Sequence, residues 1–108
     1  MALGKLIEHD YSSFWLYDPT VRQLRLHALD FPTGKGLIRE GIVIKVAGSP
    51  AGEAYTGRRA FIVAHLDDKQ FPNEATRWLL DEGIRSICLV PLSCGGRCTG
   101  VLALGSRR

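Results

Sequence analysis

The sequence predicts an α+β domain in which two short helices are inserted between the strands of a mostly antiparallel sheet. Three observations predict this fold class. Short apolar segments have strand-like alternation or β-branched composition, and two other segments begin at residues that cap helices. Gly95-Gly96 lies between two apolar runs, which is typical of a two-residue hairpin turn. The predicted order is three strands, a helix, a strand, a helix and two strands.

Length and composition favour one domain spanning residues 1–108. The chain is 45% hydrophobic and 23% charged, enough for a single core that needs no disulfide. No apolar run reaches the roughly 18 to 20 residues that cross a bilayer. The N-terminus lacks the pattern of a secretory signal, so a cytoplasmic location is expected.

The first three strands are predicted at residues 12–17 (SSFWLY), 23–29 (QLRLHAL) and 42–46 (IVIKV). The first is rich in aromatic residues and ends at Asp18-Pro19, and the second alternates between apolar and polar positions. Together they predict a hairpin. The third is β-branched, which favours a strand.

The first helix is predicted to begin at Ser49-Pro50, with Ser49 as N-cap and Pro50 at the first helical position. Gly57 is expected to end this helix in the left-handed conformation. The apolar residues 60–64 (AFIVA) then form the fourth strand.

The second helix is predicted to follow the cap residue Asn73, with Ala75, Trp78 and Leu79 on one face. Gly83 ends it, and Ile84 is expected to pack back on Leu79. Two acidic residues lie at the negative end of this helix, which is an unfavourable position for them. They are Asp81 and Glu82.

The closing hairpin joins residues 86–92 and 97–104 and contains all three cysteines. Across a two-residue turn, period-two alternation puts Cys94 and Cys98 on opposite faces, so no disulfide joins them. Cys98 is expected on the face of Ile87, Leu89, Leu102 and Leu104, and Cys94 on the face of Cys88, Val90 and Leu92. We interpret Cys98 as a small core residue.

Charge and motifs exclude several classes of function. The net charge of +3 comes from 14 basic and 11 acidic residues that are scattered along the chain, unlike the basic stripe of a nucleic-acid-binding protein. His9, His27 and His65 lie in separate segments, which disfavours a zinc site. No catalytic motif is present, so we expect no enzymatic activity, no metal and no cofactor.

Two segments are candidates for a binding site. His65 and Asp67 can form a polar lip with Phe71 as an apolar wall, or a solvated loop with Phe71 packed at the helix entry. The helix start at Ser49 can hold a carboxylate or phosphate, or Ser49 can be an ordinary cap. The residues alone leave these alternatives open.

Three segments of the sequence resemble the GAF domain family: FWLYDPTVRQLRLHAL, GSPAGEAYTGRRAFIV and EGIRSICLVPLSCGGRCTGVLALGS. The likeness covers about residues 12–106, and the closing hairpin is its most specific part. The stretch around DFPTGKGLIREG is most similar to N-terminal GAF domains of bacterial enhancer-binding transcription activators, such as the formate hydrogenlyase activator group.

The resemblance implies a PAS-related, profilin-like antiparallel sheet of five or six strands, with a small-molecule pocket on one face. Its candidate lining is His65, Asp67, Phe71, Ser49 and Cys88. Terminal helices that cover the other face in the family are missing, leaving only Leu3, Leu6 and Ile7 as cover. We therefore expect part of a longer protein, with its surface around Val90, Leu92 and Val101 exposed.

The functional hypothesis is a sensory domain that binds a small ligand and controls an attached output domain, with homodimerisation as a further expectation. A ligand-free dimerisation module is the first alternative, and a thiol-based free methionine sulfoxide reductase is the second. The cyclic-nucleotide motif of the family is absent, since Asn73 is the only asparagine. The chromophore-attachment context is not matched, and the cysteine placement departs from the reductase pattern.

Overall fold

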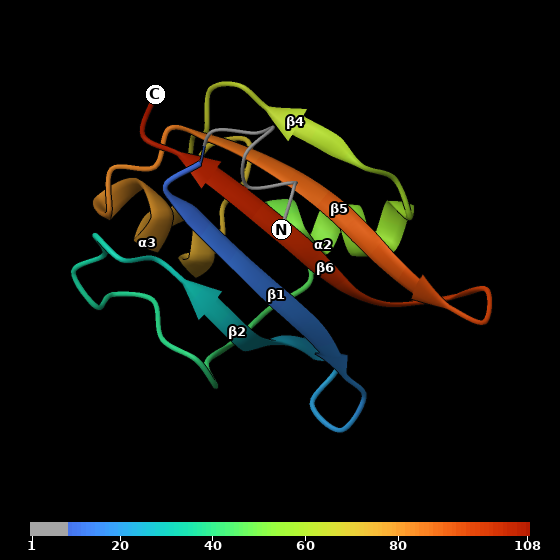
Figure 1. Ribbon diagram of the computed structural model, residues 1–108. Coiled ribbons are helices and arrows are strands. Elements are labelled where there is room, and N and C mark those ends of the chain that lie inside the picture. The colour runs from blue at the N-terminus through green and yellow to red at the C-terminus, as the bar shows by residue number, and fades with distance from the viewer. Residues whose placement is uncertain (1–8) are drawn as a thin grey trace.

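The computed structural model describes residues 9–108, which form a six-stranded antiparallel sheet in the order β3-β2-β1-β6-β5-β4. Both helices lie on one face of this sheet (Figure 1). The elements are β1 Tyr11–Asp18, β2 Gln23–Asp30, β3 Val43–Ile44, α2 Pro50–Gly57, β4 Phe61–Val63, α3 Glu74–Asp81, β5 Ser86–Cys94 and β6 Arg97–Ser106. The predicted fold class and element order are confirmed, although β3 and β4 are shorter than expected.

The core lies between the sheet and its two helices. Alternate residues of the central strands point into it, as period two requires: Trp15 on β1, Leu89 on β5 and Ala103 on β6 are each at most 3% exposed. The opposite face carries half-buried apolar side chains, including Val90 and Leu92. Leu3, Leu6 and Ile7, predicted to cover that face, lie outside the described residues.

The closing hairpin forms at Gly95-Gly96, where both glycines have positive φ and Cys94 pairs with Arg97. This confirms the predicted turn. A bulge follows at once, because Ser93 pairs with Cys98 whereas Leu92 pairs with Gly100. One extra residue in a strand moves every later side chain to the other face.

This bulge corrects two expectations. Cys98 does share a face with Leu89, but Leu102 and Leu104 pair with Val90 and Cys88 and lie on the opposite face. Val101, which was expected to be exposed, is fully buried in the core. Strict alternation from the turn misplaced these residues because it did not include the extra residue, Thr99.

Helix α2 begins as predicted and ends one residue later than predicted. The Ser49 hydroxyl accepts a hydrogen bond of 2.9 Å from the Gly52 amide, and Pro50 takes the first turn. The left-handed residue is Arg58, with φ of 52°, and not Gly57. A residue with a side chain therefore stands where glycine is usual, which strains the backbone.

Arg58→Gly is expected to stabilise the domain by about 1 kcal/mol, because glycine adopts the left-handed conformation without a Cβ clash. The measurement is the free energy of unfolding in urea. Arg59→Gly is the control, since Arg59 has no positive φ, and glycine there is expected to give no stabilisation. An Arg58→Gly variant less stable than the wild type would contradict the claim that Arg58 strains the backbone.

Helix α3 is capped by Asn73, whose side-chain oxygen accepts a bond of 2.9 Å from the Ala75 amide. The same side chain donates to the carbonyls of Lys45 and Ala47, at 3.0 and 2.9 Å. It therefore ties the helix start to the segment before α2. At the other end Gly83 has a φ of 85°. The Ile84 amide bonds back to the Leu79 carbonyl, as predicted.

Candidate functional site

A small cavity lies between the sheet and the two helices. Its volume is about 20 Å³, which is room for roughly one water molecule. Most of its lining is apolar and comes from every layer of the domain. The lining is Tyr11, Trp15, Ile38, Ile44, Ser49, Pro50, Ala51, Ala75, Trp78, Leu79, Ile87, Leu89 and Ala103.

A polar chain of three β1 residues, here called the floor, lies at the cavity; Tyr11 and Trp15 border it and Ser13 joins them. The Tyr11 hydroxyl lies 2.5 Å from the Ser13 hydroxyl, which accepts a bond of 2.8 Å from the Trp15 indole. These groups have three hydrogens to donate and make two bonds with one another. Within the described part of the chain, one hydroxyl hydrogen of the Tyr11–Ser13 pair is thus left over. When Ser13 donates to Tyr11, this hydrogen belongs to Tyr11, which borders the cavity.

Burial keeps this floor uncharged. Desolvation raises the pKa of Tyr11 from 10.0 to about 12, against the smaller lowering effects of its bonds to Ser13 and Trp15. A buried phenol loses solvation when it ionises, so the neutral form is retained. At neutral pH the floor therefore carries no charge and has one hydroxyl hydrogen to donate.

Tyr11→Phe is expected to remove a loss of stability at high pH. Because the folded pKa exceeds the unfolded one, the contribution is complete below pH 10 and lost as the pH rises toward 12. A shift of about two units corresponds to roughly 2–3 kcal/mol. Urea unfolding at about pH 9 and about pH 11.5 should show a larger loss in the wild type. An equal loss of unfolding free energy in the wild type and in Tyr11→Phe would contradict the raised pKa of Tyr11.

Residues 31–42, here called the roof segment, are irregular in structure and contribute Ile38 to the cavity. Glu82, only 2% exposed at the end of α3, holds this segment. Its carboxylate accepts bonds of 2.9 Å from the Lys35 amide and 3.3 Å from the Leu37 amide. The unfavourable helix-end position of Glu82 is thus explained by the backbone amides that it binds.

Arg107, just after β6, fastens the start of the roof segment. Its guanidinium donates to the Glu82 carbonyl at 3.1 Å, and to the hydroxyl and carbonyl of Thr33. It also lies over the Phe31 ring, 5.1 Å from the centroid. Phe31 in turn meets Tyr11 edge-on at 5.3 Å. Contacts therefore run from the cavity floor through the roof to the end of β6.

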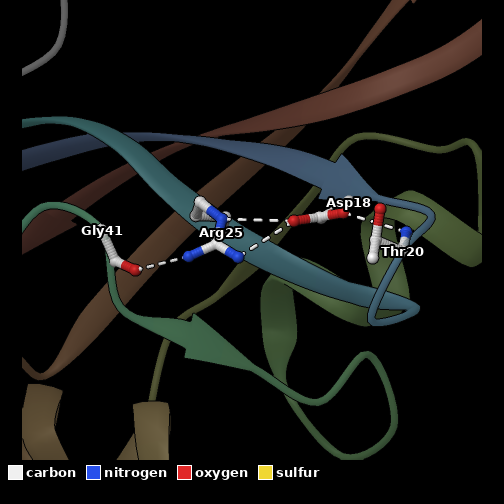
Figure 2. A network of polar contacts seen from close by, with 4 residues as sticks. All are labelled: Asp18, Thr20, Arg25 and Gly41. Carbon is white, nitrogen blue, oxygen red and sulfur yellow. Dashed lines mark hydrogen bonds and ion pairs between the residues drawn. The ribbon is translucent and has the colours of Figure 1, made fainter.

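Arg25 on β2 fastens the other end of the roof segment (Figure 2). It donates to the Gly41 carbonyl at 3.0 Å and forms an ion pair with Asp18, also at 3.0 Å. The bond from Arg25, assisted by one from the Thr20 amide, lowers the pKa of Asp18. The roof is thus held at both ends by polar contacts that need no ligand.

The structure brings only one of the five predicted site residues to this cavity. Ser49 borders it, fully buried, while serving as the α2 cap. His65 and Asp67 are exposed, and the Asp67 carboxylate accepts bonds from two amides of its own loop. Phe71 is buried in the core but does not line the cavity.

Cys88 lies on the opposite face of the sheet. It pairs with Ile62 and Leu104, and its neighbours Ile87 and Leu89 are the ones that border the cavity. All three cysteines are free thiols. Among residues 9–108, no three His, Cys, Asp or Glu side chains gather as a metal site would require.

Sequence reasoning did not identify the floor or roof residues as parts of a site. Glu82 gave the clearest signal in the sequence, because an acidic residue at the negative end of a helix needs a compensating partner. The Tyr11–Ser13–Trp15 spacing also places three donors on one strand face. No described helix has the length and apolar character needed to cross a membrane.

Comparison with known proteins agrees with this architecture. The family model for the GAF domain matches residues 2–108. The GAF domain of a two-component sensor histidine kinase from Bacillus halodurans is 24% identical, with a TM-score of 0.79, over 99% of this chain and 71% of that one. No curated protein matches the sequence significantly.

Two further solved structures share the fold. A mutated NreA protein from Staphylococcus aureus, altered in its nitrate binding site, is 19% identical with a TM-score of 0.73, over 99% of this chain and 79% of that one. Free methionine-R-sulfoxide reductase from Neisseria meningitidis is 22% identical with a TM-score of 0.71. This match covers 98% of this chain and 57% of the reductase chain. With the family match over nearly its whole length, this chain belongs to the GAF domain family, whose members are typically sensory or regulatory modules.

Proposed function

We propose that this domain senses a small molecule that binds in the cavity between the sheet and helices α2 and α3. The observation that carries the proposal is the spare hydroxyl hydrogen of the Tyr11–Ser13 pair at a small and otherwise largely apolar cavity. Few precisely placed polar groups in an apolar lining are typical of ligand sites. The likeness to a sensor-kinase GAF domain supports a signalling role.

The cavity limits the chemistry of the ligand. No charged side chain lines it, and its spare donor is the one hydroxyl hydrogen left over in the floor. A hydrogen-bond acceptor is therefore required. The volume of about 20 Å³ admits only a very small molecule, so a larger ligand requires the roof segment to move.

The proposed output is an attached domain of a cytoplasmic signalling protein, either a transcription activator of the enhancer-binding class or a sensor kinase, acting as a homodimer. A ligand shifts such an equilibrium only through different affinities for two states. The roof segment is the element proposed to differ between these states. It is held by discrete polar bonds that can be exchanged for bonds to a ligand.

A ligand-free structural module is the second candidate. The small cavity favours it, because the domain's own side chains already fill most of the space between sheet and helices. An enzymatic role as a sulfoxide reductase has less support. Although a reductase shares the fold, Cys88 faces away from the cavity and no cysteine borders it.

A thermal-shift panel tests the proposal, with nitrate, small carboxylates and small neutral carbonyl compounds as probes. Nitrate is included because the similar NreA protein is described as having a nitrate binding site. A ligand at one hundred times its Kd stabilises the folded state by about 2.7 kcal/mol. At least one probe is expected to raise the Tm of the wild type.

Ala103→Val is the test variant, because Ala103 borders the cavity on a strand that accepts a β-branched residue. Ala28→Val is the matched control on an exposed position of β2. The stabilising probe should act on the wild type and Ala28→Val but not on Ala103→Val. An equal response of both variants would assign the probe to another site. No response to any probe would favour the ligand-free module.

A further inference from the structure

A second and larger hollow lies outside the proposed sensing cavity. It has a volume of about 550 Å³ and shares no lining residue with that cavity. The end of β1, the end of α2 and the start of β6 form it. We call it the end groove, lined by Tyr17, Pro19, Tyr55, Thr56, Arg58, Arg97, Cys98 and Thr99.

Two tyrosines form one wall of the end groove. The rings of Tyr17 and Tyr55 are stacked, with 4.9 Å between centroids and 12° between planes. Cys98 lies beside them and is 7% exposed. This wall offers flat apolar surface together with phenol hydroxyls, the kind of surface that fixes a flat ligand.

Two arginines of the end groove have guanidinium groups without partners. Within residues 9–108, Arg58 and Arg97 make no side-chain hydrogen bond or ion pair, and no carboxylate lines the groove. Asp18, between two groove residues in sequence, is instead bound to Arg25. The two guanidinium groups therefore remain available for an anion.

Both arginines act electrostatically on the phenol of Tyr55. Its pKa is raised by burial and by the neighbouring Tyr17 and Cys98, while Arg58 and Arg97 each act to lower it. Both positive charges therefore act on the phenol hydroxyl. An anion beside this hydroxyl would interact with both of them.

The backbone at Arg58 gives a separate reason to examine the end groove. Arg58 adopts a left-handed conformation that glycine fits better. Gly57, the adjacent residue, does not have a positive φ. Strain of this kind occurs at binding sites, where it positions a side chain.

We propose that the end groove binds a small molecule that carries an oxyanion, either a carboxylate or a phosphate. Arg58 and Arg97 hold the oxyanion, and a flat apolar part of the molecule lies against the Tyr17–Tyr55 wall. Guanidinium groups match the geometry of both oxyanions. This site is independent of the sensing cavity, so it stands whether or not that cavity binds a ligand.

Calorimetric titration of the full chain tests the proposal with four probes: benzoate, phenyl phosphate, inorganic phosphate and benzyl alcohol. Benzoate or phenyl phosphate is expected to bind, and the stronger of the two identifies the oxyanion. Inorganic phosphate should bind more weakly than phenyl phosphate because it lacks the flat part. Neutral benzyl alcohol should not bind measurably.

Arg58→Gly is the decisive variant, because it removes the guanidinium while its backbone conformation remains favourable. Arg58→Gly and Arg97→Gln are each expected to weaken binding by at least about tenfold, a loss of one good charged contact. Arg59→Gln removes the same charge next to the groove without lining it. It should change the Kd by less than about twofold.

Several outcomes would overturn the proposal. One is that neither benzoate nor phenyl phosphate binds at millimolar concentration. Another is that Arg58→Gly binds as tightly as the wild type. A third is that Arg59→Gln loses as much affinity as Arg58→Gly. Loss of binding in the cavity variant Ala103→Val would assign the probes to the sensing cavity instead. As a separate readout, Arg58→Gly should raise the pKa of Tyr55 in a tyrosinate absorbance titration, with Tyr55→Phe identifying the signal.

Discussion

Glu82→Gln is expected to release the roof segment while the sheet stays folded. The buried carboxylate accepts bonds from the Lys35 and Leu37 amides, and charge-assisted bonds of this kind contribute about 1.5–3 kcal/mol. Glutamine has one acceptor oxygen and directs an NH2 group toward amide hydrogens. Amide exchange at Lys35 and Leu37 should accelerate about a hundredfold, which corresponds to about 3 kcal/mol.

Asp81→Asn is the matched control for this prediction. It makes the same change of charge at the same end of α3, but Asp81 is exposed and is not bonded to the roof segment. We expect little change in roof exchange and a small gain in stability, because a negative charge leaves the negative end of a helix. Unchanged exchange at Lys35 and Leu37 in Glu82→Gln would contradict the role of Glu82.

Gly52→Ala is expected to destabilise the domain by more than about 4 kcal/mol, enough to unfold a protein of ordinary stability. A Cβ on Gly52 would lie 1.6 Å from the Val46 carbonyl oxygen and 2.8 Å from the Ser49 hydroxyl. Both neighbours are fixed, one as backbone and one as the helix cap. Urea unfolding monitored by circular dichroism measures the effect.

Gly57→Ala is the control in the same helix. A Cβ there meets nothing within 4 Å, and alanine favours the helix by up to about 1 kcal/mol. This variant should be as stable as the wild type or slightly more stable. A Gly52→Ala protein within about 1 kcal/mol of the wild type would show that α2 can move away from Val46. The close approach would then not fix the position of Ser49 and Ala51 at the cavity.

Elements that depend on local chemistry were predictable from the sequence. The caps at Ser49 and Asn73 and the Gly95-Gly96 turn each involve residues close together in the chain, so their side-chain types were sufficient. The bulge at Thr99 was missed, although Gly100 beside it is a residue type that often marks a bulge inside a strand. Its effect extended along β6 and reversed the faces of Val101 and Leu102.

The candidate site was harder to predict because its contacts are distant in sequence. Glu82 and the Lys35 amide are 47 residues apart, and Arg107 and Thr33 are 74 apart. Loop residues with suggestive chemistry can instead satisfy themselves, as Asp67 does with amides of its own loop. Ser49 is the one predicted residue that borders the cavity, and it does so while serving as the local cap of α2.

The most direct test of the central claim uses the two indole N–H signals in a proton–nitrogen correlation spectrum. Trp15 and Trp78 are the only tryptophans of the chain, and both border the cavity between sheet and helices. A probe that raises the Tm is expected to shift both indole signals, with Trp15 moving further because its N–H belongs to the floor. A stabilising probe that leaves both signals unmoved would contradict binding in this cavity.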